Sequence, residues 1–129
     1  MGYMTKFDLR AYDAATSAPI SDELEHEITY RLEQIAFNTK MTRQEFEAYW
    51  HHPVSFESWT GDEMKWYGHE NDMAALSKEY PNVLFILNGV GEEFPDAWCL
   101  WAQNGAVEKV YAEIKIPSPT NPMFASWSV

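Results

Sequence analysis

The dipeptide Asn104-Gly105 places the strongest local constraint on how this chain folds. Both central residues of a type I′ turn need a positive φ angle, which asparagine and glycine adopt at low cost. After the dipeptide, apolar and polar residues alternate over 110–116, and a further strand is expected before it, from Ala97 to Gln103. The sequence therefore predicts a β-hairpin with a two-residue turn. Counting outward from the turn gives the expected cross-strand pairs Gln103 with Ala106, Cys99 with Val110, and Trp98 with Tyr111.

The two hairpin strands are expected over residues 97–103 and 110–116. In the second strand the alternation places the apolar residues at even positions, from Val110 to Ile116, on one face. We expect this face to join the core together with Ala97, Cys99 and Trp101. This assignment would leave Trp98 and Tyr111, with Leu100 and Val107, on the opposite, open face.

A continuous apolar run, Val83-Leu84-Phe85-Ile86-Leu87, precedes the hairpin. Such a run is typical of a strand in the middle of a sheet or covered on both faces. The residues from Asn88 to Glu93 are polar, acidic and glycine-containing, so we expect a flexible connection there.

The first half of the chain predicts one strand followed by two helices. Residues 6–12 alternate as a half-buried strand does. Apolar residues then recur at helical spacing after an N-cap at Ser21 or Asp22, which predicts a helix to about Asn38. A capping box at Thr42–Glu45 predicts a short second helix that ends before Pro53.

The middle of the chain predicts a further strand and a further helix. Residues 54–59 alternate, and residues 63–67 are expected to continue this strand or to form a hairpin with it. Residues 69–79 carry acidic side chains at their start and Lys78 near their end, which favours a helix.

This order of elements, β-α-β-α-β-β, predicts an α+β fold with a ferredoxin-like antiparallel sheet and helices on one face. A length of 129 residues fits one acidic domain spanning 1–129, with an irregular tail from about residue 117. The residues expected in the core are Leu24, Ile28, Leu32, Met73, Leu76, Leu84, Ile86, Val110, Ala112 and Ile114.

The chain is strongly acidic, with 9 Lys and Arg against 20 Asp and Glu and a net charge of −11. No cluster of basic residues is available to neutralise phosphates, so direct nucleic-acid binding is not expected. The carboxylates either keep an aromatic-rich chain soluble or meet a partner protein with a basic surface.

The expected compartment is the cytoplasm, the host cell cytosol if the chain is viral. The lone cysteine, Cys99, cannot form an internal disulfide, as secreted domains of this size commonly do. The N-terminus lacks the pattern of a signal peptide, and no run of residues is apolar enough to span a membrane. Whether the chain forms oligomers is left open.

Patterns that would indicate catalysis are weak. Glu47 and His51 have helical spacing, with His52 adjacent, but a third metal ligand is missing. Cys99 lies in an apolar strand, where a structural thiol is expected rather than a nucleophile. No phosphate-binding loop, dinucleotide fingerprint or nucleophile elbow occurs. We therefore expect no enzyme activity, no catalytic residues, no cofactor and no metal.

Several segments of the C-terminal half together suggest a family. They are residues 66–73, the run Leu76-Ser77-Lys78-Glu79-Tyr80-Pro81 with the apolar strand that follows it, Gly91-Glu92-Glu93, Asp96-Ala97-Trp98 and Asn104-Gly105. This half resembles the YubB-type ferredoxin-like domain of phage and plasmid proteins. The resemblance implies a fold and a mobile-element origin, and it assigns neither an activity nor catalytic residues.

Two functions of different classes follow as hypotheses. The first is a phage-type acidic protein that binds and inhibits a host protein of defence or nucleic-acid handling, as an anti-CRISPR or anti-restriction protein would. Its expected partner-binding residues are Glu92, Glu93, Asp96, Trp98 and Tyr111. The alternative is a small-molecule or nucleotide-binding module that stacks its ligand on aromatic residues of the open sheet face.

Overall fold

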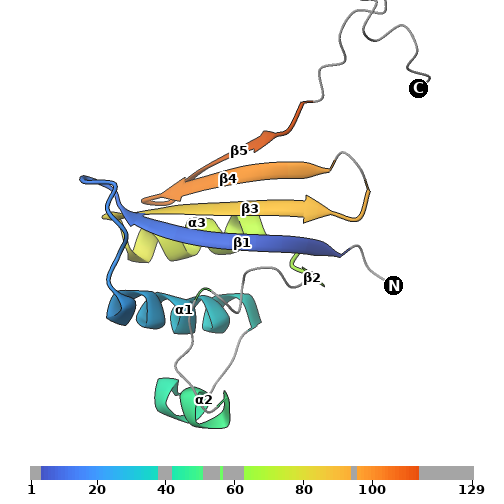
Figure 1. The fold of residues 1–129 in the computed structure, drawn as a ribbon. Helices are drawn as coiled ribbons and strands as arrows, with labels where there is room; N and C mark the ends of the chain where they lie inside the picture. The colour runs from blue at the N-terminus through green and yellow to red at the C-terminus, as the bar shows by residue number, and fades with distance from the viewer. Residues whose placement is uncertain (1–3, 38–41, 51–55, 57–62, 94–95, 114–129) are drawn as a thin grey trace, which may run out of the picture.

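The computed structural model describes residues 4–37, 42–50, 56, 63–93 and 96–113 (Figure 1). These residues form three helices and five strands. In chain order they are β1 (Thr5–Asp13), α1 (Asp22–Phe37), α2 (Arg43–Trp50), β2 (Glu63–Met64), α3 (His69–Glu79), β3 (Val83–Gly91), β4 (Ala97–Gln103) and β5 (Ala106–Tyr111).

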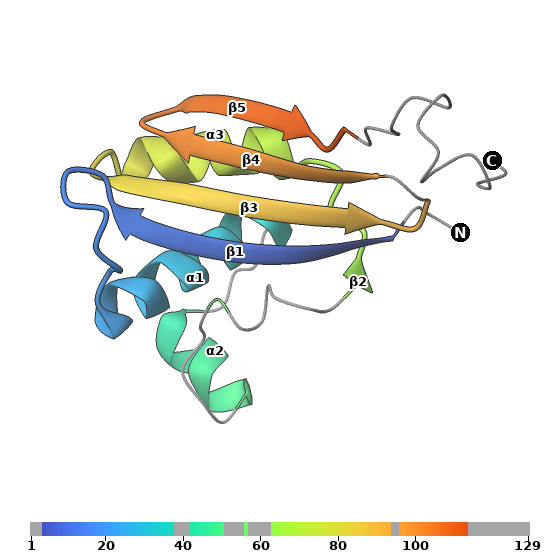
Figure 2. The same cartoon turned by 45° about the horizontal axis from the view of Figure 1, so that its top comes forward.

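The strands form one antiparallel sheet in the order β2-β1-β3-β4-β5. Helices α1 and α3 cover one face of it, and α2 lies beyond α1, away from the sheet (Figures 1 and 2). No described helix covers the other face. The chain therefore has the α+β fold, with the ferredoxin-like layout of an open antiparallel sheet and helices on one face, that the order of elements predicts.

The Asn104-Gly105 turn forms as predicted. Both residues have positive φ angles, 48° and 85°, and β4 pairs with β5 in the expected register, with Cys99 opposite Val110. The buried Ser77 of α3 holds the turn against the helix layer, because its Oγ accepts a hydrogen bond of 2.9 Å from the Gly105 amide. The turn thus fixes both the hairpin register and its position on α3.

The predicted facing of the hairpin is wrong. Trp98, Leu100 and Ala102 are at most 7% exposed and point to the helices, whereas Trp101 and Val110 are more than half exposed on the open face. The predicted core residue Ala112 is exposed as well, and Ile114 lies outside the described residues. Both faces of these strands carry apolar side chains, so alternation alone does not tell which face the helices cover.

The same error of one residue affects β3. Val83, Phe85 and Leu87 are buried against the helices, while the predicted core residues Leu84 and Ile86 are only half-buried on the open face. A continuous apolar run has no polar positions that mark its exposed side. The burial pattern of β3 is therefore set by the neighbouring strands and helices.

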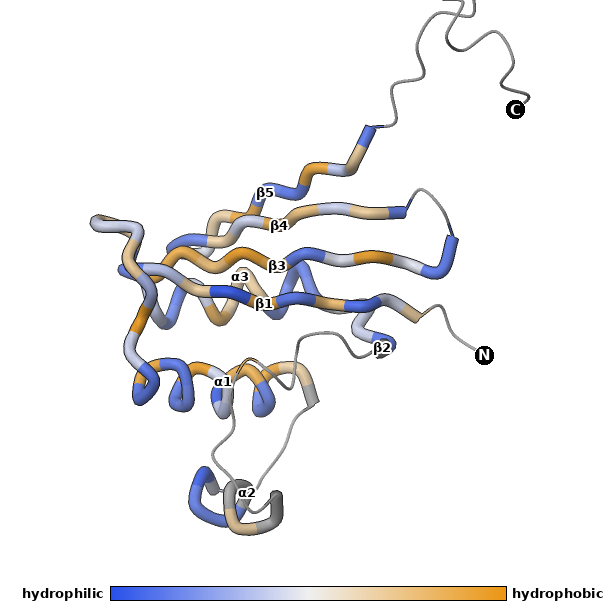
Figure 3. Tube along the Cα trace, viewed as in Figure 1, coloured by the Kyte–Doolittle hydropathy of each residue, from blue (hydrophilic) through white to orange (hydrophobic). Residues whose placement is uncertain are grey.

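The core lies between the sheet and the two covering helices. Figure 3 shows hydrophobic residues concentrated along β3 and on the side of α1 that faces the sheet. Four predicted core residues are fully buried, namely Ile28 and Leu32 of α1 and Met73 and Leu76 of α3. Leu24 is partly buried against this cluster. The helical spacing of apolar residues thus identified the buried faces of α1 and α3 correctly.

The helix N-termini follow their predicted caps. Ser21 Oγ accepts a hydrogen bond of 3.2 Å from the amide of Leu24, and Thr42 Oγ1 accepts one of 3.1 Å from the amide of Glu45. Each bond satisfies an amide that has no partner within its own helix. Helix α1 ends at Phe37, close to the predicted end.

Several strand boundaries differ from the prediction. β2 covers only Glu63–Met64 of the expected 63–67, and β5 begins at Ala106 rather than at Val110. β3 continues to Gly91 through residues expected to form a flexible connection, because Asn88 and its neighbours pair with both β1 and β4. β5 ends at Tyr111, and the remainder of its predicted range from residue 114, like the tail, lies outside the described residues.

The strand expected at 54–59 is likewise outside the described residues, apart from Phe56. This residue is buried, and its amide donates a 3.4 Å hydrogen bond to Glu25 of α1. Among the described residues no helix is long and apolar enough to cross a membrane.

Candidate functional site

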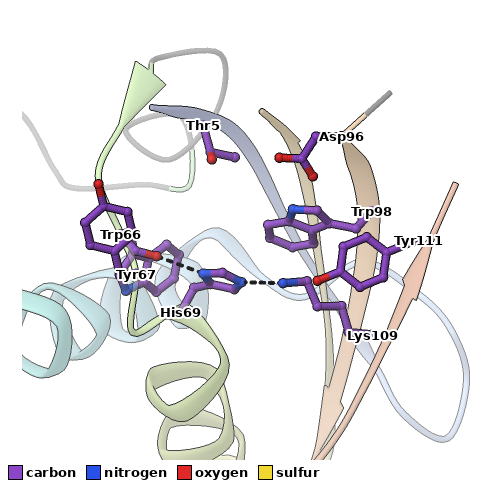
Figure 4. A pocket seen from close by; sticks show the side chains of 8 residues that line it. All are labelled: Thr5, Trp66, Tyr67, His69, Asp96, Trp98, Lys109 and Tyr111. Atoms are coloured by element: carbon purple, nitrogen blue, oxygen red, sulfur yellow. Dashed lines mark hydrogen bonds between the residues drawn. The ribbon is translucent and has the colours of Figure 1, made fainter. Parts of the chain in front are cut away.

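One end of the sheet contains a small cleft between α3 and the β4–β5 hairpin (Figure 4). Its volume is about 180 Å³. The cleft, called the aromatic cleft below, is lined by Thr5, Trp66, Tyr67, His69, Asp96, Trp98, Lys109 and Tyr111. These residues come from β1, from the segment that enters α3, from the first residue of α3, from the hairpin, and, for Asp96, from the residue just before β4.

Trp98 forms one wall of the aromatic cleft. Its ring stacks on the imidazole of His69, with centroids 4.7 Å apart and planes 10° from parallel, and Phe7 packs edge-on at 5.9 Å. The ring extends across β3 at Gly89, its cross-strand neighbour. A Cβ atom at Gly89 would lie only 2.2 Å from Trp98 Cζ2, so this close approach requires glycine.

Lys109 places a positive charge among these rings. Its ammonium lies 4.2 Å from the centroid of Trp98 and 5.2 Å from that of Tyr111, within the range of cation–π attraction. It also donates hydrogen bonds of 3.1 Å to Glu70 Oε1 and 3.0 Å to His69 Nε2. The side chain is only 14% exposed, so the charge is neutralised within the protein and largely shielded from water.

The contacts of His69 fix its protonation state. Nδ1 lies 2.8 Å from the carbonyl oxygen of Trp66, and because a carbonyl only accepts, Nδ1 carries the proton. Nε2 then accepts from Lys109, as Figure 4 shows, so the ring is neutral. Burial lowers the pKa of His69, and the charge of Lys109 lowers it further, against the opposing effects of the Trp66 carbonyl, Glu70 and Asp72.

Acidification should therefore destabilise the protein through His69. The imidazole pKa is below its ordinary value of about 6.5 in the folded state, so between the two pKa values the unfolded chain binds a proton that the folded chain does not. This destabilisation is absent well above pH 6.5 and grows as the pH falls below it. Melting temperatures measured from pH 7.5 to pH 5 should fall less steeply for His69→Asn than for the wild type, and equal slopes would show that His69 does not contribute.

The structure brings three of the five predicted partner-binding residues together. Asp96, Trp98 and Tyr111 line the aromatic cleft, while Glu92 and Glu93 are exposed on the adjoining β3–β4 connection. Glu92 Oε1 also accepts a 3.0 Å hydrogen bond from the amide of Met4.

The expected role of Trp98 needs correction, because it is 7% exposed and faces α3 rather than the open face of the sheet. Tyr111 is on the same face as Trp98. At 59% exposed, it is the accessible aromatic residue among the five predicted partner-binding residues.

Sequence reasoning missed the other cleft residues, above all Lys109 and His69. Lys109 is two residues before Tyr111 on β5, so the predicted register already placed it on the same face as Trp98. It was missed because that face was expected to be open rather than packed against α3. His69 and Trp66 reach the cleft through the packing of α3 on the hairpin, and no local pattern predicts that contact.

The described residues contain no group of three or more His, Cys, Asp or Glu that could hold a metal ion. Glu47, weighed as a ligand from the sequence, is in α2, and His51 and His52 lie outside the described residues. The aromatic cleft instead combines ring faces, one internally neutralised ammonium and a rim with carboxylates. No family model, no curated protein and no solved structure matches the chain.

Proposed function

We propose that this protein binds a partner protein with a basic surface, through a rim formed by Glu92, Glu93, Asp96 and Tyr111. The observation that carries the proposal is that these side chains gather at one end of the sheet. The register supports it, since Thr5 pairs with Gly91, Val90 with Ala97, and Trp98 with Tyr111.

The rim combines the two features that protein recognition uses. Carboxylates on an acidic protein attract a basic partner and speed the encounter, and they exclude partners of the wrong charge. Tyr111 supplies an exposed ring that can be buried in the complex, and aromatic residues of this kind are enriched among residues that dominate binding energy. Trp98 pairs with Tyr111 across the hairpin, but it is buried and has no direct role in the contact.

The expected biological role is inhibition of a host protein that handles nucleic acids. Such proteins present basic grooves to their substrates, and an acidic rim with an aromatic residue is complementary to such a groove. The resemblance of the C-terminal half to a domain of phage and plasmid proteins also favours an anti-CRISPR or anti-restriction role. This chain would act by occupying the groove, without contacting nucleic acid itself and without catalysis.

A capture experiment with matched baits tests the proposal. The wild type, Glu92→Lys/Glu93→Lys and Glu23→Lys/Glu27→Lys would each be immobilised and exposed to the same host lysate. The control pair is exposed on α1, whose N-terminal half lies at the opposite end of the sheet, and it changes the net charge equally (Figure 2). We expect a protein that the wild type and the control retain and the rim variant loses; equal retention on all three baits would argue against the rim.

A second candidate is small-ligand binding in the aromatic cleft itself. The observation that favours it is the stack of Trp98 on His69 beside the ammonium of Lys109, which offers ring faces and polar atoms within one cavity. Stacking depends little on ionic strength, whereas attraction between charged surfaces is screened by salt. Small-ligand binding that persists unchanged at high salt would favour this second function, provided that Tyr111→Ala and Lys109→Met each abolish it.

A further inference from the structure

The open face of the sheet carries an apolar surface that the proposed function does not use. Among the described residues, five large hydrophobic side chains are more than half exposed, and Val90, Trp101 and Val110 are three of them on this face. Leu84 and Ile86 of β3 lie on the same face, half-buried. Figure 2 shows this side of the sheet, with α1 and α3 behind it.

The cross-strand register arranges this face in rows that run from β1 to β5. One row consists of Arg10, Ile86, Trp101 and Glu108, so that it is basic at β1, apolar at the centre and acidic at β5. The neighbouring row consists of Asp8, Asn88, Cys99 and Val110, and the next begins with Lys6, Val90 and Ala97. Within β1, β3, β4 and β5 the face thus carries two basic and two acidic residues, in a chain with a net charge of −11.

We infer that this face binds a second copy of the same chain. A twofold axis parallel to the strands, between β3 and β4, would place β1 over β5 of the second copy and β3 over its β4. Because such an axis leaves the position along the strands unchanged, Arg10 would lie over Glu108 of the second copy, and Ile86 over its Trp101. Each pair would occur twice in a symmetric dimer.

The geometry of packed sheets allows these contacts. Two sheets pack face to face about 10 Å apart with their strands about 30° from parallel, a separation that an arginine and a glutamate side chain can bridge together. Arg10 is 62% exposed and donates hydrogen bonds of 3.3 and 3.4 Å to Asp8 on its own strand, an exposed pair that contributes little to stability. Trp101 Nε1 already donates to Cys99 Sγ at 3.0 Å, so burial of the indole leaves no polar atom without a partner.

Charge also distinguishes this face from the rest of the surface. Two molecules of charge −11 repel each other, and most surfaces of this chain would bring carboxylates together. The open face has equal numbers of both signs, and the twofold axis sets one pair of opposite charges, Arg10 and Glu108, against each other. A contact of four strands is small beside most stable interfaces, so we expect a dimer that dissociates in the micromolar range.

A charge-swap series read by analytical ultracentrifugation tests this dimer. The wild type should associate reversibly as its concentration is raised through the micromolar range. Arg10→Glu and Glu108→Arg should each weaken the dimer roughly tenfold or more, because each reversal sets like charges opposite one another twice. The double variant Arg10→Glu/Glu108→Arg restores opposite charges and should recover most of the affinity. Trp101→Ser should abolish the dimer, with an unchanged melting temperature in dilute solution as evidence of folding.

Two results would overturn the inference. The first is a wild type that stays monomeric at every concentration. Fluorescence quenching of Trp101 would then tell why: quenching would mean a bare face, and protection would mean that residues 114–129 cover it. The second is a double variant that associates less than either single variant, since that would exclude the twofold pairing. Neither result bears on the acidic rim, which is made of other residues.

Discussion

Replacing Phe85 with alanine should lower the free energy of unfolding by about 3–5 kcal/mol, the usual cost of emptying a buried phenylalanine site. Phe85 is fully buried in β3, the middle strand of the sheet, with β1 on one side at Ala11 and β4 on the other at Ala102. Because both cross-strand neighbours are alanines, the Phe85 ring occupies most of the volume in this part of the core. Urea denaturation, extrapolated to water, measures the change.

Ile86→Ala is the matched control for the facing of β3. It removes a large apolar side chain from the next residue of the same strand, and Ile86 is half-buried on the open face. Measured in dilute solution, its cost should be less than half that of Phe85→Ala. A larger loss at Ile86 than at Phe85 would contradict the observed facing and support the one that alternation suggested.

Gly89→Ala should cost about 1–3 kcal/mol, the usual range for overpacking a core. In an ordinary strand position this substitution is neutral or stabilising, since alanine restricts the unfolded chain more than glycine does. Here the new Cβ atom would lie 2.2 Å from Trp98 Cζ2, and the indole is held between Phe7, His69 and the ammonium of Lys109. The ring would have to move, and the wall of the aromatic cleft would move with it.

A double-mutant cycle separates this collision from other effects of the substitution. Trp98→Leu removes the atoms that the new Cβ would meet while keeping an apolar side chain. Gly89→Ala should therefore cost much less in the Trp98→Leu background than in the wild type. If the cost is the same in both backgrounds, the cause lies in the backbone at Gly89 and not in the indole ring.

Local chemistry determined what the sequence could predict about the fold. Asn104-Gly105 fixes the hairpin register because the turn needs two positive φ angles, and each side of the turn then pairs by counting. The buried faces of α1 and α3 were equally predictable, since Ile28 and Leu32 mark one apolar side of α1, and Met73 and Leu76 mark one of α3. These signals depend on neighbours in sequence and need no knowledge of the tertiary structure.

The facing of the sheet could not be predicted for a physical reason. Phe85 and Ile86 are comparable in hydrophobicity, as are Leu100 and Trp101, so either face of β3 and β4 could have been covered by helices. The polar residues of β1 show which face of β3 is open only once the register between β1 and β3 is known. Lys6, Asp8 and Arg10 lie across from the open-face residues, and pairing over such a distance in sequence is not a local signal.

The candidate site was predictable in part for the same reason. Asp96, Trp98 and Tyr111 were expected to be neighbours because they belong to the hairpin or precede it directly, and they do line one cleft. Lys109 was on the same face as Trp98 in the predicted register, and it was missed because that face was expected to be open rather than packed against α3. His69 required the contact of α3 with the hairpin, which is a tertiary feature.

The rate of association with the partner, at low ionic strength, tests the central claim most directly. Glu92→Lys/Glu93→Lys should bind the captured partner roughly tenfold more slowly than the wild type, because it reverses charge on the surface that meets the partner. Glu23→Lys/Glu27→Lys, with the same net charge, should associate nearly as fast as the wild type. If the two variants are slowed equally, or neither is slowed, the acidic rim does not recognise the partner and its carboxylates contribute only to the charge of the whole protein.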